Sequence, residues 1–358
     1  MTVDRDPDTD DTDTDDTDID DPAPDGLAGG PGVDPDAWAD AERRVEEYLL
    51  GGPRRLTRCD VRERTAVPLE RSTRLWNALG FAAPADDVAS FTDTDVGVLD
   101  LTGSLLADDT FDEAEALAIA RTLGQSVARL AEWQANLLRR SIGDATDPDA
   151  VVESVQTLVP LLERLQVYAW RRHLAVTASR MMAGLAHPDG GDHQDTLLVG
   201  FADVVGFTAL SREVDTGELR SLLERFEAVT GDVVARHGGR IVKTLGDEVL
   251  FVSGRVDAGL EIAFDLQDEV PDDAGRLALR IGMAYGEVLP RYGDVYGPVV
   301  NIASRLTSHA RPGAILVDDD LTEAVRAADL PFDLRAVPAL AVRGYRHLKP
   351  HVLRRRRS

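Results

Sequence analysis

The sequence has almost no cysteine and no long apolar run. Cys59 is the only cysteine among 358 residues, which excludes an internal disulfide and fits a reducing compartment. No apolar run approaches the roughly 20 residues that a bilayer-spanning helix needs. The acidic N-terminus does not resemble a secretory signal. These absences predict a soluble, cytoplasmic protein with no membrane partner.

Positive charge is also scarce. The chain has 39 Lys and Arg against 64 Asp and Glu, a formal net charge of −25. This balance argues against non-specific nucleic-acid binding, which depends on Lys and Arg. Residues 1–36 hold 14 aspartates and one arginine, so about half of the negative charge is local. Such an acidic, low-complexity segment buries too little apolar surface to fold, and we predict a disordered tail.

The next part of the chain has a helical pattern. Apolar residues recur at helical spacing over four segments, the second of which is broken at Val67-Pro68. These segments are residues 37–50, 60–81, 111–142 and 147–182. The pattern predicts an all-α regulatory domain over residues 37–185. Residues 186–195, rich in Pro, Gly, Asp and His, are then an inter-domain linker.

After the linker the pattern changes to alternating strands and helices. Strands are expected at 196–202, 240–246, 248–253, 277–289, 314–318, 332–342 and 351–356. Helices are expected at 216–239, 256–270, 301–310 and 320–328. A strand, a helix, a hairpin, a helix and a strand form a split βαβ, ferredoxin-like core. The fold class is therefore α+β, with a catalytic domain over residues 196–356.

Two carboxylates interrupt apolar segments of this domain. Asp203 ends the first strand, and Asp247 lies in the hairpin turn KTLGDEVLF. In the split βαβ order these strands are neighbours, so the two side chains face each other. Paired carboxylates repel unless a cation lies between them, and oxygen-only ligands suit Mg²⁺ or Mn²⁺. On their own, Gly246-Asp247 also fits an ordinary hairpin turn, and Asp203 a capping acid.

Other polar residues suggest nucleotide chemistry. Phe207 and Thr208 follow Asp203 just before a helix, where backbone N–H groups can cradle a triphosphate. Asn301 and Arg305 are four residues apart on a helix and share a face that can hold a phosphate or a ribose, or simply face solvent. A donor such as Lys243 and an acceptor such as Asp294 can read a purine edge.

Three motifs, FADVVGFT, KTLGDEVLF and GDVYGPVVNIASRL, resemble the class III nucleotidyl cyclase catalytic domain in its bacterial adenylyl cyclase form. The resemblance covers about residues 194–356. It implies roles for six positions: metal binding by Asp203 and Asp247, adenine selection by Lys243 and Asp294, and transition-state stabilisation by Asn301 and Arg305. Guanylyl cyclases usually carry Glu and Cys at the adenine-selecting positions. Arg343, in AVRGY, is a further candidate for the triphosphate.

The resemblance also implies a reaction and an assembly. ATP would cyclise to 3′,5′-cyclic AMP and pyrophosphate with two metal ions per site. The family forms head-to-tail dimers, with metal carboxylates from one subunit and the remaining residues from the other. With all six positions filled in one chain, a homodimer with two equivalent sites is expected.

The helical region resembles the regulatory domain that precedes the catalytic domain in some actinobacterial adenylyl cyclases and inhibits it at neutral or alkaline pH. His173, His187 and His193 lie near the domain junction. Because histidine titrates near neutrality, acid-linked release of inhibition is one hypothesis. Unremarkable surface histidines are the alternative.

Three rival functions compete with the cyclase interpretation. LTRCDVRERTAVPLERSTRLWNALGF followed by FTDTDVGVL also resembles a winged-helix or MerR-type helix-turn-helix, which favours a DNA-binding regulator. Its basic cluster comprises Arg54, Arg55, Arg58, Arg62, Arg64, Arg71 and Arg74. The second rival is a diguanylate cyclase. That family has a Gly-Gly-Asp/Glu-Glu-Phe turn, which differs from the turn in KTLGDEVLF, and it has no segment that corresponds to GDVYGPVVNIASRL. A silent nucleotide sensor would have lost a metal aspartate or the transition-state arginine, and neither is lost here.

Overall fold

The computed structural model describes residues 34–356 except 66, 108–110, 144–146, 186–194, 272–276 and 343–344. The chain divides into two compact units, Met1–Leu174 and Ala175–Ser358, and the division falls inside one long helix. The predicted tail lies outside the described residues except for its last three. The predicted linker lies outside them except for Asp195. Both therefore stay predictions.

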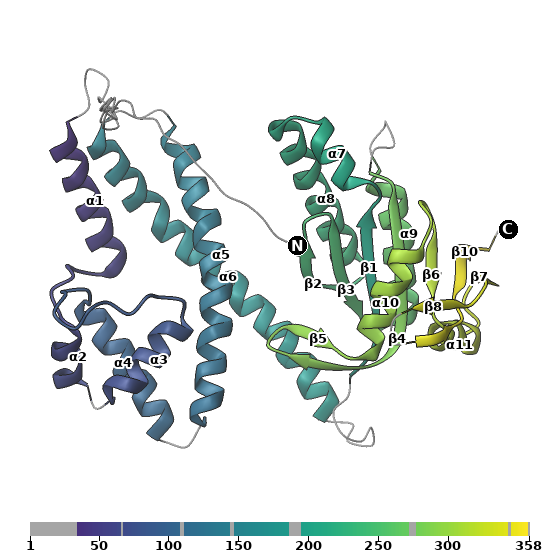
Figure 1. Ribbon diagram of the computed structural model, residues 1–358, viewed down its shortest axis with the longest axis horizontal. Coiled ribbons are helices and arrows are strands. Elements are labelled where there is room, and N and C mark those ends of the chain that lie inside the picture. The colour runs from purple at the N-terminus through teal and green to yellow at the C-terminus, as the bar shows by residue number, and fades with distance from the viewer. Residues whose placement is uncertain are drawn as a thin grey trace, which may run out of the picture. The chain divides into compact units, whose positions relative to one another are not determined.

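The first unit is helical, as predicted (Figure 1). Its helices are α1 (Pro35–Leu50), α2 (Arg58–Arg64), α3 (Leu69–Ala78), α4 (Asp93–Ala107), α5 (Glu113–Ile142) and α6 (Pro148–Leu185). Asp34 caps the start of α1, and Gly51 ends it in the left-handed conformation that glycine favours. Helix α4 was not predicted. In the described part of the chain, no helix is both long and apolar enough to cross a membrane.

A small core holds α2, α3 and α4 together. The buried side chains are Leu56, Val61, Phe91 and Leu99, and Trp76 packs against them with its ring edge toward Phe91. Leu56 and Phe91 also form an isolated antiparallel bridge. The bridge links a residue that precedes α2 to one that precedes α4. Helices α2 and α3 are the two short helical pieces expected around the break at Val67-Pro68.

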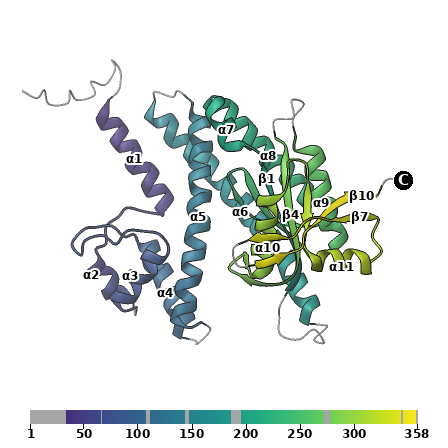
Figure 2. The same cartoon turned by 45° about the vertical axis from the view of Figure 1, so that its right-hand side comes forward.

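The second unit is a mixed sheet with helices on both faces (Figures 1 and 2). The strand order is β2-β3-β1-β4-β6-β10-β7, with β5 paired to β4. The strands of this sheet are β1 (Asp195–Val204), β2 (Arg240–Leu245), β3 (Glu248–Ser253), β4 (Leu279–Arg291), β5 (Asp294–Tyr296), β6 (Ile315–Val317), β7 (Phe332–Ala336) and β10 (His351–Arg355). The predicted split βαβ arrangement with β1 between β3 and β4 is confirmed.

Alternation along β1 divides the core into two layers. Leu198 and Ala202 point to the layer formed with α8 (Thr216–Arg236), α9 (Val256–Glu269) and α11 (Asp319–Ala327). Val199 and Phe201 point to the opposite layer, which is covered by α10 (Pro298–His309). Helix α7 (Phe207–Glu213) follows β1 directly. Among the described residues, Phe207 and Leu210 of α7 pack against the same layer as α8, α9 and α11, whereas α10 covers the opposite face.

Three sequence predictions need correction. The strand predicted over 332–342 is two strands, β7 and β8 (Leu340–Val342), in different sheets, because Val337 and Pro338 interrupt it. Strand β9 (Tyr345–Leu348), which pairs with β8, was not predicted. Strand β5, which begins at Asp294, was not predicted either.

Candidate active site

Three charged residues form a row across the face of the sheet that carries α10. Asp203 on β1 lies directly opposite Glu248 on β3 and Arg280 on β4. Directly paired residues point to the same face, and Asp203 is only 8% exposed. The Nε of Arg280 donates a hydrogen bond to Oδ2 of Asp203. This guanidinium neutralises the buried carboxylate.

The β2–β3 turn brings a third carboxylate to the same end of the sheet. Gly246 adopts a left-handed conformation, with φ of 66°, and Asp247 follows it. The backbone N–H of Val204 donates to the carbonyl of Asp247 at 3.1 Å, which ties the turn to the end of β1. Burial raises the pKa of Asp247, and the charge of Asp203 adds to this effect. Asp203 and Asp247 are therefore neighbours, as the sequence predicted.

This donor set fits a divalent cation. Burial raises the pKa of Glu248 as well, with further contributions from Asp203 and Asp247. Three partly buried carboxylates against one guanidinium leave an excess of negative charge that a cation would relieve. Among the described residues, no three acidic, His or Cys side chains already converge tightly enough to enclose a metal ion.

Lys243 and Asp294 meet although they are 51 residues apart. The Nζ of Lys243, on β2, lies 2.7 Å from Oδ2 of Asp294, on β5. Burial acts to raise the pKa of Asp294, but the hydrogen bond from Lys243 and other contacts outweigh it, so this pKa is lowered. The pair places a charged donor beside a charged acceptor, as recognition of a purine edge would require.

Asn301 and Arg305 lie on the exposed side of α10. The other side of this helix buries Val299, Ala303 and Leu306 against the sheet. Within the described part of the chain, neither the Asn301 amide nor the Arg305 guanidinium has a recorded side-chain hydrogen bond or ion pair. Helix α10 approaches β4 closely at Gly282, where an added Cβ would lie 2.2 Å from the backbone nitrogen of Thr307. The two polar groups therefore project from a tightly seated helix.

The six predicted residues fall into separate groups on one sheet face. Lys243 lies opposite Leu250, which lies opposite Phe201, so Lys243 is two strands away from Asp203 and offset along them. No recorded side-chain hydrogen bond or ion pair of the described residues joins the carboxylate end to the Lys243–Asp294 pair or to α10. Within the described residues, the three groups are therefore not in side-chain contact through hydrogen bonds or ion pairs.

The remaining predicted residues are placed as follows. Phe207 begins α7 and packs partly buried against the core, whereas Thr208 is exposed in the first turn of that helix. Arg343 lies outside the described residues. Sequence reasoning gave no role to Arg280 or Glu248. The alternation of strand positions, combined with the β1–β3 and β1–β4 pairing, is the signal that could have found them.

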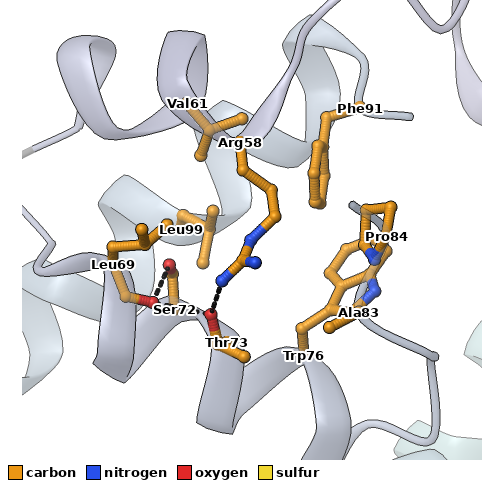
Figure 3. A pocket seen from close by; sticks show the side chains of 10 residues that line it. All are labelled: Arg58, Val61, Leu69, Ser72, Thr73, Trp76, Ala83, Pro84, Phe91 and Leu99. Carbon is orange, nitrogen blue, oxygen red and sulfur yellow. Dashed lines mark hydrogen bonds between the residues drawn. The ribbon is translucent and has the colours of Figure 1, made fainter. Parts of the chain in front are cut away.

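The helical unit has a small pocket of about 20 Å³, separate from these residues (Figure 3). It is lined by Arg58, Val61, Leu69, Ser72, Thr73, Trp76, Ala83, Pro84, Phe91 and Leu99. The Arg58 guanidinium reaches Thr73 Oγ1 at 2.7 Å and Asp86 at 2.5 Å. Arg58 therefore serves the packing of this unit.

Comparison with known proteins places this geometry in a family. A model of the adenylate and guanylate cyclase catalytic domain matches residues 192–355. The chain is 39% identical over 320 residues to an adenylate cyclase of Streptomyces coelicolor, covering 87% of this chain and 80% of that one. It is 34% identical over 341 residues to an adenylate cyclase of Glutamicibacter nicotianae, covering 90% and 84%.

A third relative, a pH-sensitive adenylate cyclase of Mycobacterium tuberculosis, is 31% identical over 278 residues, covering 74% of this chain and 69% of that one. The first two alignments extend far beyond the catalytic domain and so include the helical region. The chain therefore belongs to the class III nucleotidyl cyclase family and is an enzyme of the adenylate cyclase type. The family predicted from the sequence motifs is confirmed.

Proposed function

We propose that this chain converts ATP to 3′,5′-cyclic AMP and pyrophosphate with two Mg²⁺ or Mn²⁺ ions at each of two sites of a homodimer. The observation that carries the proposal is the division of the predicted residues into separate groups on one sheet face. Asn301 and Arg305 project from α10 with no side-chain hydrogen bond or ion pair to any other described residue. Asp203 and Asp247 lie elsewhere, at the end of β1 and in the β2–β3 turn. In a head-to-tail dimer, Asn301 and Arg305 of one copy would meet Asp203 and Asp247 of the other copy, and each pairing would form one complete site.

Each group has a distinct task in this reaction. Lys243 donates to, and Asp294 accepts from, the adenine edge, which both accepts and donates hydrogen bonds. Asn301 orients the ribose so that its 3′-oxygen faces the α-phosphorus. Arg305 stabilises the negative charge that develops as the 3′-oxygen bond forms and the bond to pyrophosphate breaks. The first residues of α7, Phe207 and Thr208, and also Arg343, are proposed contacts of the triphosphate.

Asp203 and Asp247 would hold the cations. Two bound cations would lower the pKa of the ribose hydroxyl and neutralise charge on the leaving phosphates. Arg280, which donates a hydrogen bond to Asp203, would pair with a phosphate oxygen when Asp203 binds a cation. This exchange keeps the guanidinium paired while freeing Asp203.

The direct test is an assay of the purified chain with Mn²⁺ and either ATP or GTP, with cyclic nucleotide and pyrophosphate measured together. We expect cyclic AMP and pyrophosphate in equal amounts from ATP, and much slower turnover of GTP. The Asp203→Ala and Arg305→Ala variants serve as negative controls. Failure of the wild-type chain to form cyclic AMP from ATP, under conditions in which it is folded, would refute the proposal.

We also propose that the helical region regulates this reaction, with pH as one input. The similarity to a pH-sensitive cyclase supports this. His173 is exposed on α6, which fits the alternative of an ordinary surface histidine equally well. His187 and His193 lie outside the described residues. Cyclase activity of the full chain should differ between pH 5.5 and pH 8 beyond the change expected from the catalytic chemistry. Equal activity at the two pH values contradicts pH control.

The helix-turn-helix pattern does not by itself favour DNA binding. Six of the seven arginines in the basic cluster form ion pairs within the first unit, to Glu46, Asp86, Asp93, Glu113 or Glu70. Paired guanidiniums attract phosphates less strongly, and the chain is negatively charged as a whole. We therefore do not propose DNA binding for this unit.

A further inference from the structure

The β4–β5 hairpin reaches back to the edge strand of the sheet. Strand β5 pairs with β4, whereas β2 lies three places from β4 in the strand order, beyond β1 and β3. Even so, β5 contacts β2 (Figure 1). Val295 of β5 is buried in the same layer as Leu250 of β3. The hairpin therefore lies over the face of the sheet that α10 also covers.

Two bonds from β2 hold the tip of this hairpin. The Nζ of Lys243 lies 2.7 Å from Oδ2 of Asp294. The Nη1 of Arg240 donates to the carbonyl oxygen of Gly293 at 2.9 Å. The tip is a tight two-residue turn, Tyr292-Gly293, in which both residues have positive φ, of 51° and 84°. Because a non-glycine residue such as Tyr292 adopts this conformation only at a cost, the surrounding contacts must offset it.

A bulge in β2 turns both cations toward the hairpin. Residues three apart on a regular strand point to opposite faces of the sheet. The β2–β3 register shifts after Ile241, however, so that Arg240 lies opposite Val252. Lys243 lies opposite Leu250, which shares its layer of the core with Val252. Directly opposed residues point to the same face. The extra residue of the bulge thus brings Arg240 and Lys243 to one side, as bulges near functional sites often do.

The two bonds have different tasks when a purine binds. Lys243 and Asp294 bond to each other, and in the proposed reaction each must also serve the base. The bond from Arg240 to the Gly293 carbonyl uses neither of those groups, so it can hold the hairpin while the base is read. Burial acts to raise the pKa of Asp294, whereas the hydrogen bond and charge of Lys243 and the charge of Arg240 act to lower it. Arg240 therefore favours both the position and the charged form of the acceptor.

We propose that Arg240 is a positioning residue for the choice of purine. It holds the hairpin tip against β2 through Gly293, and it thereby keeps Asp294 within reach of the exocyclic amino group of adenine. The proposal rests on the proposed function and adds a residue that does not itself touch the base. It also gives the β2 bulge a purpose, since a regular strand would point Arg240 away from the hairpin.

The alternative is that Arg240 only stabilises the fold. Its loss would then affect every nucleotide alike, because a less stable chain has fewer folded sites whatever the base. A role in placing Asp294 depends instead on the group that Asp294 contacts. The two interpretations therefore differ in how the loss varies with the base.

The test compares ATP with purine riboside 5′-triphosphate, which lacks the exocyclic amino group, as substrates of the full-length chain with Mn²⁺. Arg240→Met keeps a side chain of similar length and removes the donors. We expect it to lower kcat/KM for ATP by about tenfold, mainly through KM, because one charge-assisted hydrogen bond is lost. With purine riboside triphosphate, kcat/KM should stay within about twofold of the wild type, because Asp294 has no amino group to accept from.

Two further variants sharpen the comparison. Arg240→Lys keeps a charged donor and should recover part of the loss with ATP. The matched control is Arg335→Met, at an exposed position on strand β7, which should equal the wild type with both nucleotides. Thermal unfolding checks that each variant folds, and Arg240→Lys carries the test if Arg240→Met does not fold.

Equal fold-losses with the two nucleotides would overturn the proposal, because they indicate a general structural role. Wild-type kinetics of Arg240→Met with ATP would overturn it as well. In both cases an active wild-type chain leaves the proposed function standing and rejects the role of Arg240 alone. A folded wild-type chain that forms no cyclic AMP rejects the proposed function itself.

Discussion

Asp203 and Arg280 face each other across neighbouring strands and share a hydrogen bond, so the acid that the family motif assigns to metal binding is neutralised by its own chain. A cation must compete with this guanidinium for the same carboxylate. The guanidinium offsets the cost of burying the Asp203 carboxylate, because a buried carboxylate without a counter-charge is costly. It also links cation binding to whatever draws Arg280 away.

Replacing Asp203 should abolish the reaction without unfolding the chain. Loss of this carboxylate removes a cation ligand, so we expect cyclic AMP formation by Asp203→Ala to fall by at least about 10²–10³-fold. The guanidinium of Arg280 is partly exposed and can be hydrated, so the free energy of unfolding should fall by only about 1 kcal/mol. Cyclase assays and chemical denaturation of the same preparation check both values. Substantial turnover in the variant contradicts the assignment of Asp203.

Two inactive variants should restore each other. In a mixture of Asp203→Ala and Arg305→Ala chains, a heterodimer contains one site with both defects and one site with none. If subunits exchange at random, half of the dimers are mixed, and we expect about one quarter of the wild-type activity in this symmetric arrangement. Each variant alone should be inactive. An inactive mixture, when mass photometry of tagged chains shows that heterodimers have formed, argues that each site belongs to a single chain.

The Lys243–Asp294 pair should control the choice of purine. Guanine presents the opposite donor and acceptor pattern at the edge that these residues would read. We expect the double variant Lys243→Glu, Asp294→Cys to lose activity with ATP and to gain activity with GTP relative to the wild type. The ratio of kcat/KM for the two nucleotides is the measurement. An unchanged ratio means that base selection lies elsewhere.

A footprint can locate the nucleotide independently of activity. The chain contains only two lysines, Lys243 and Lys349. A non-hydrolysable ATP analogue with Mn²⁺ should protect Lys243 from an amine-selective reagent and leave Lys349 unprotected, as measured by mass spectrometry. Equal labelling of Lys243 with and without nucleotide counts against its role.

Gly282 should tolerate no side chain. A Cβ at this position would overlap the backbone of α10 at Thr307 and Ala303. We expect Gly282→Ala to lower the free energy of unfolding by about 1–3 kcal/mol or more and to displace Asn301 and Arg305. The matched control is Gly231→Ala on α8, where nothing lies within 4 Å of an added Cβ. It should stabilise the helix by about 0.5–1 kcal/mol. Equal stability of the two variants would refute the tight seating of α10.

Asp318 should make the second unit less stable as the pH rises. Its side chain is 3% exposed and accepts a hydrogen bond from the Leu321 N–H at the start of α11. Burial raises the pKa of Asp318 to about 7 from 3.8. Between these values the folded chain binds more protons than the unfolded chain, so the free energy of unfolding falls as pH increases, by up to about 4 kcal/mol.

The matched variant is Asp318→Asn, which keeps an oxygen to cap α11 and cannot ionise. Its stability advantage over the wild type should already be present at pH 5 and should be clearly larger at pH 8, as measured by chemical denaturation. If the difference between the two proteins is the same at both pH values, Asp318 does not titrate in this window.

Much of the catalytic unit was predictable because its signals are local or carried by motifs. The Asp203–Asp247 approach follows from placing a hairpin beside β1, and the Gly246-Asp247 turn fixes the position of the second acid. The helix bearing Asn301 and Arg305 follows from their spacing. Arg280 and Glu248 escaped prediction because their importance comes from lateral register between strands, which no single segment contains.

Other errors also have physical causes. The segment 332–342 has a strand-like composition throughout, but Pro338 lacks the N–H that a continuous ladder requires, so the chain divides between two sheets. Strand β5 has only three residues, which is too short for a periodic pattern. Helix α4 begins in a Thr- and Asp-rich stretch that resembles a loop, although Thr92 and Asp95 exchange hydrogen bonds that start it.

The exposed side of α10 has a consequence for output. If every working site draws on two copies, a solitary chain produces no signal, however well it folds. Specific activity would then fall on dilution, and the rate would rise with the square of protein concentration in the dilute limit. A cell that keeps the concentration of this chain near the dissociation constant of the dimer could set second-messenger production by expression level alone.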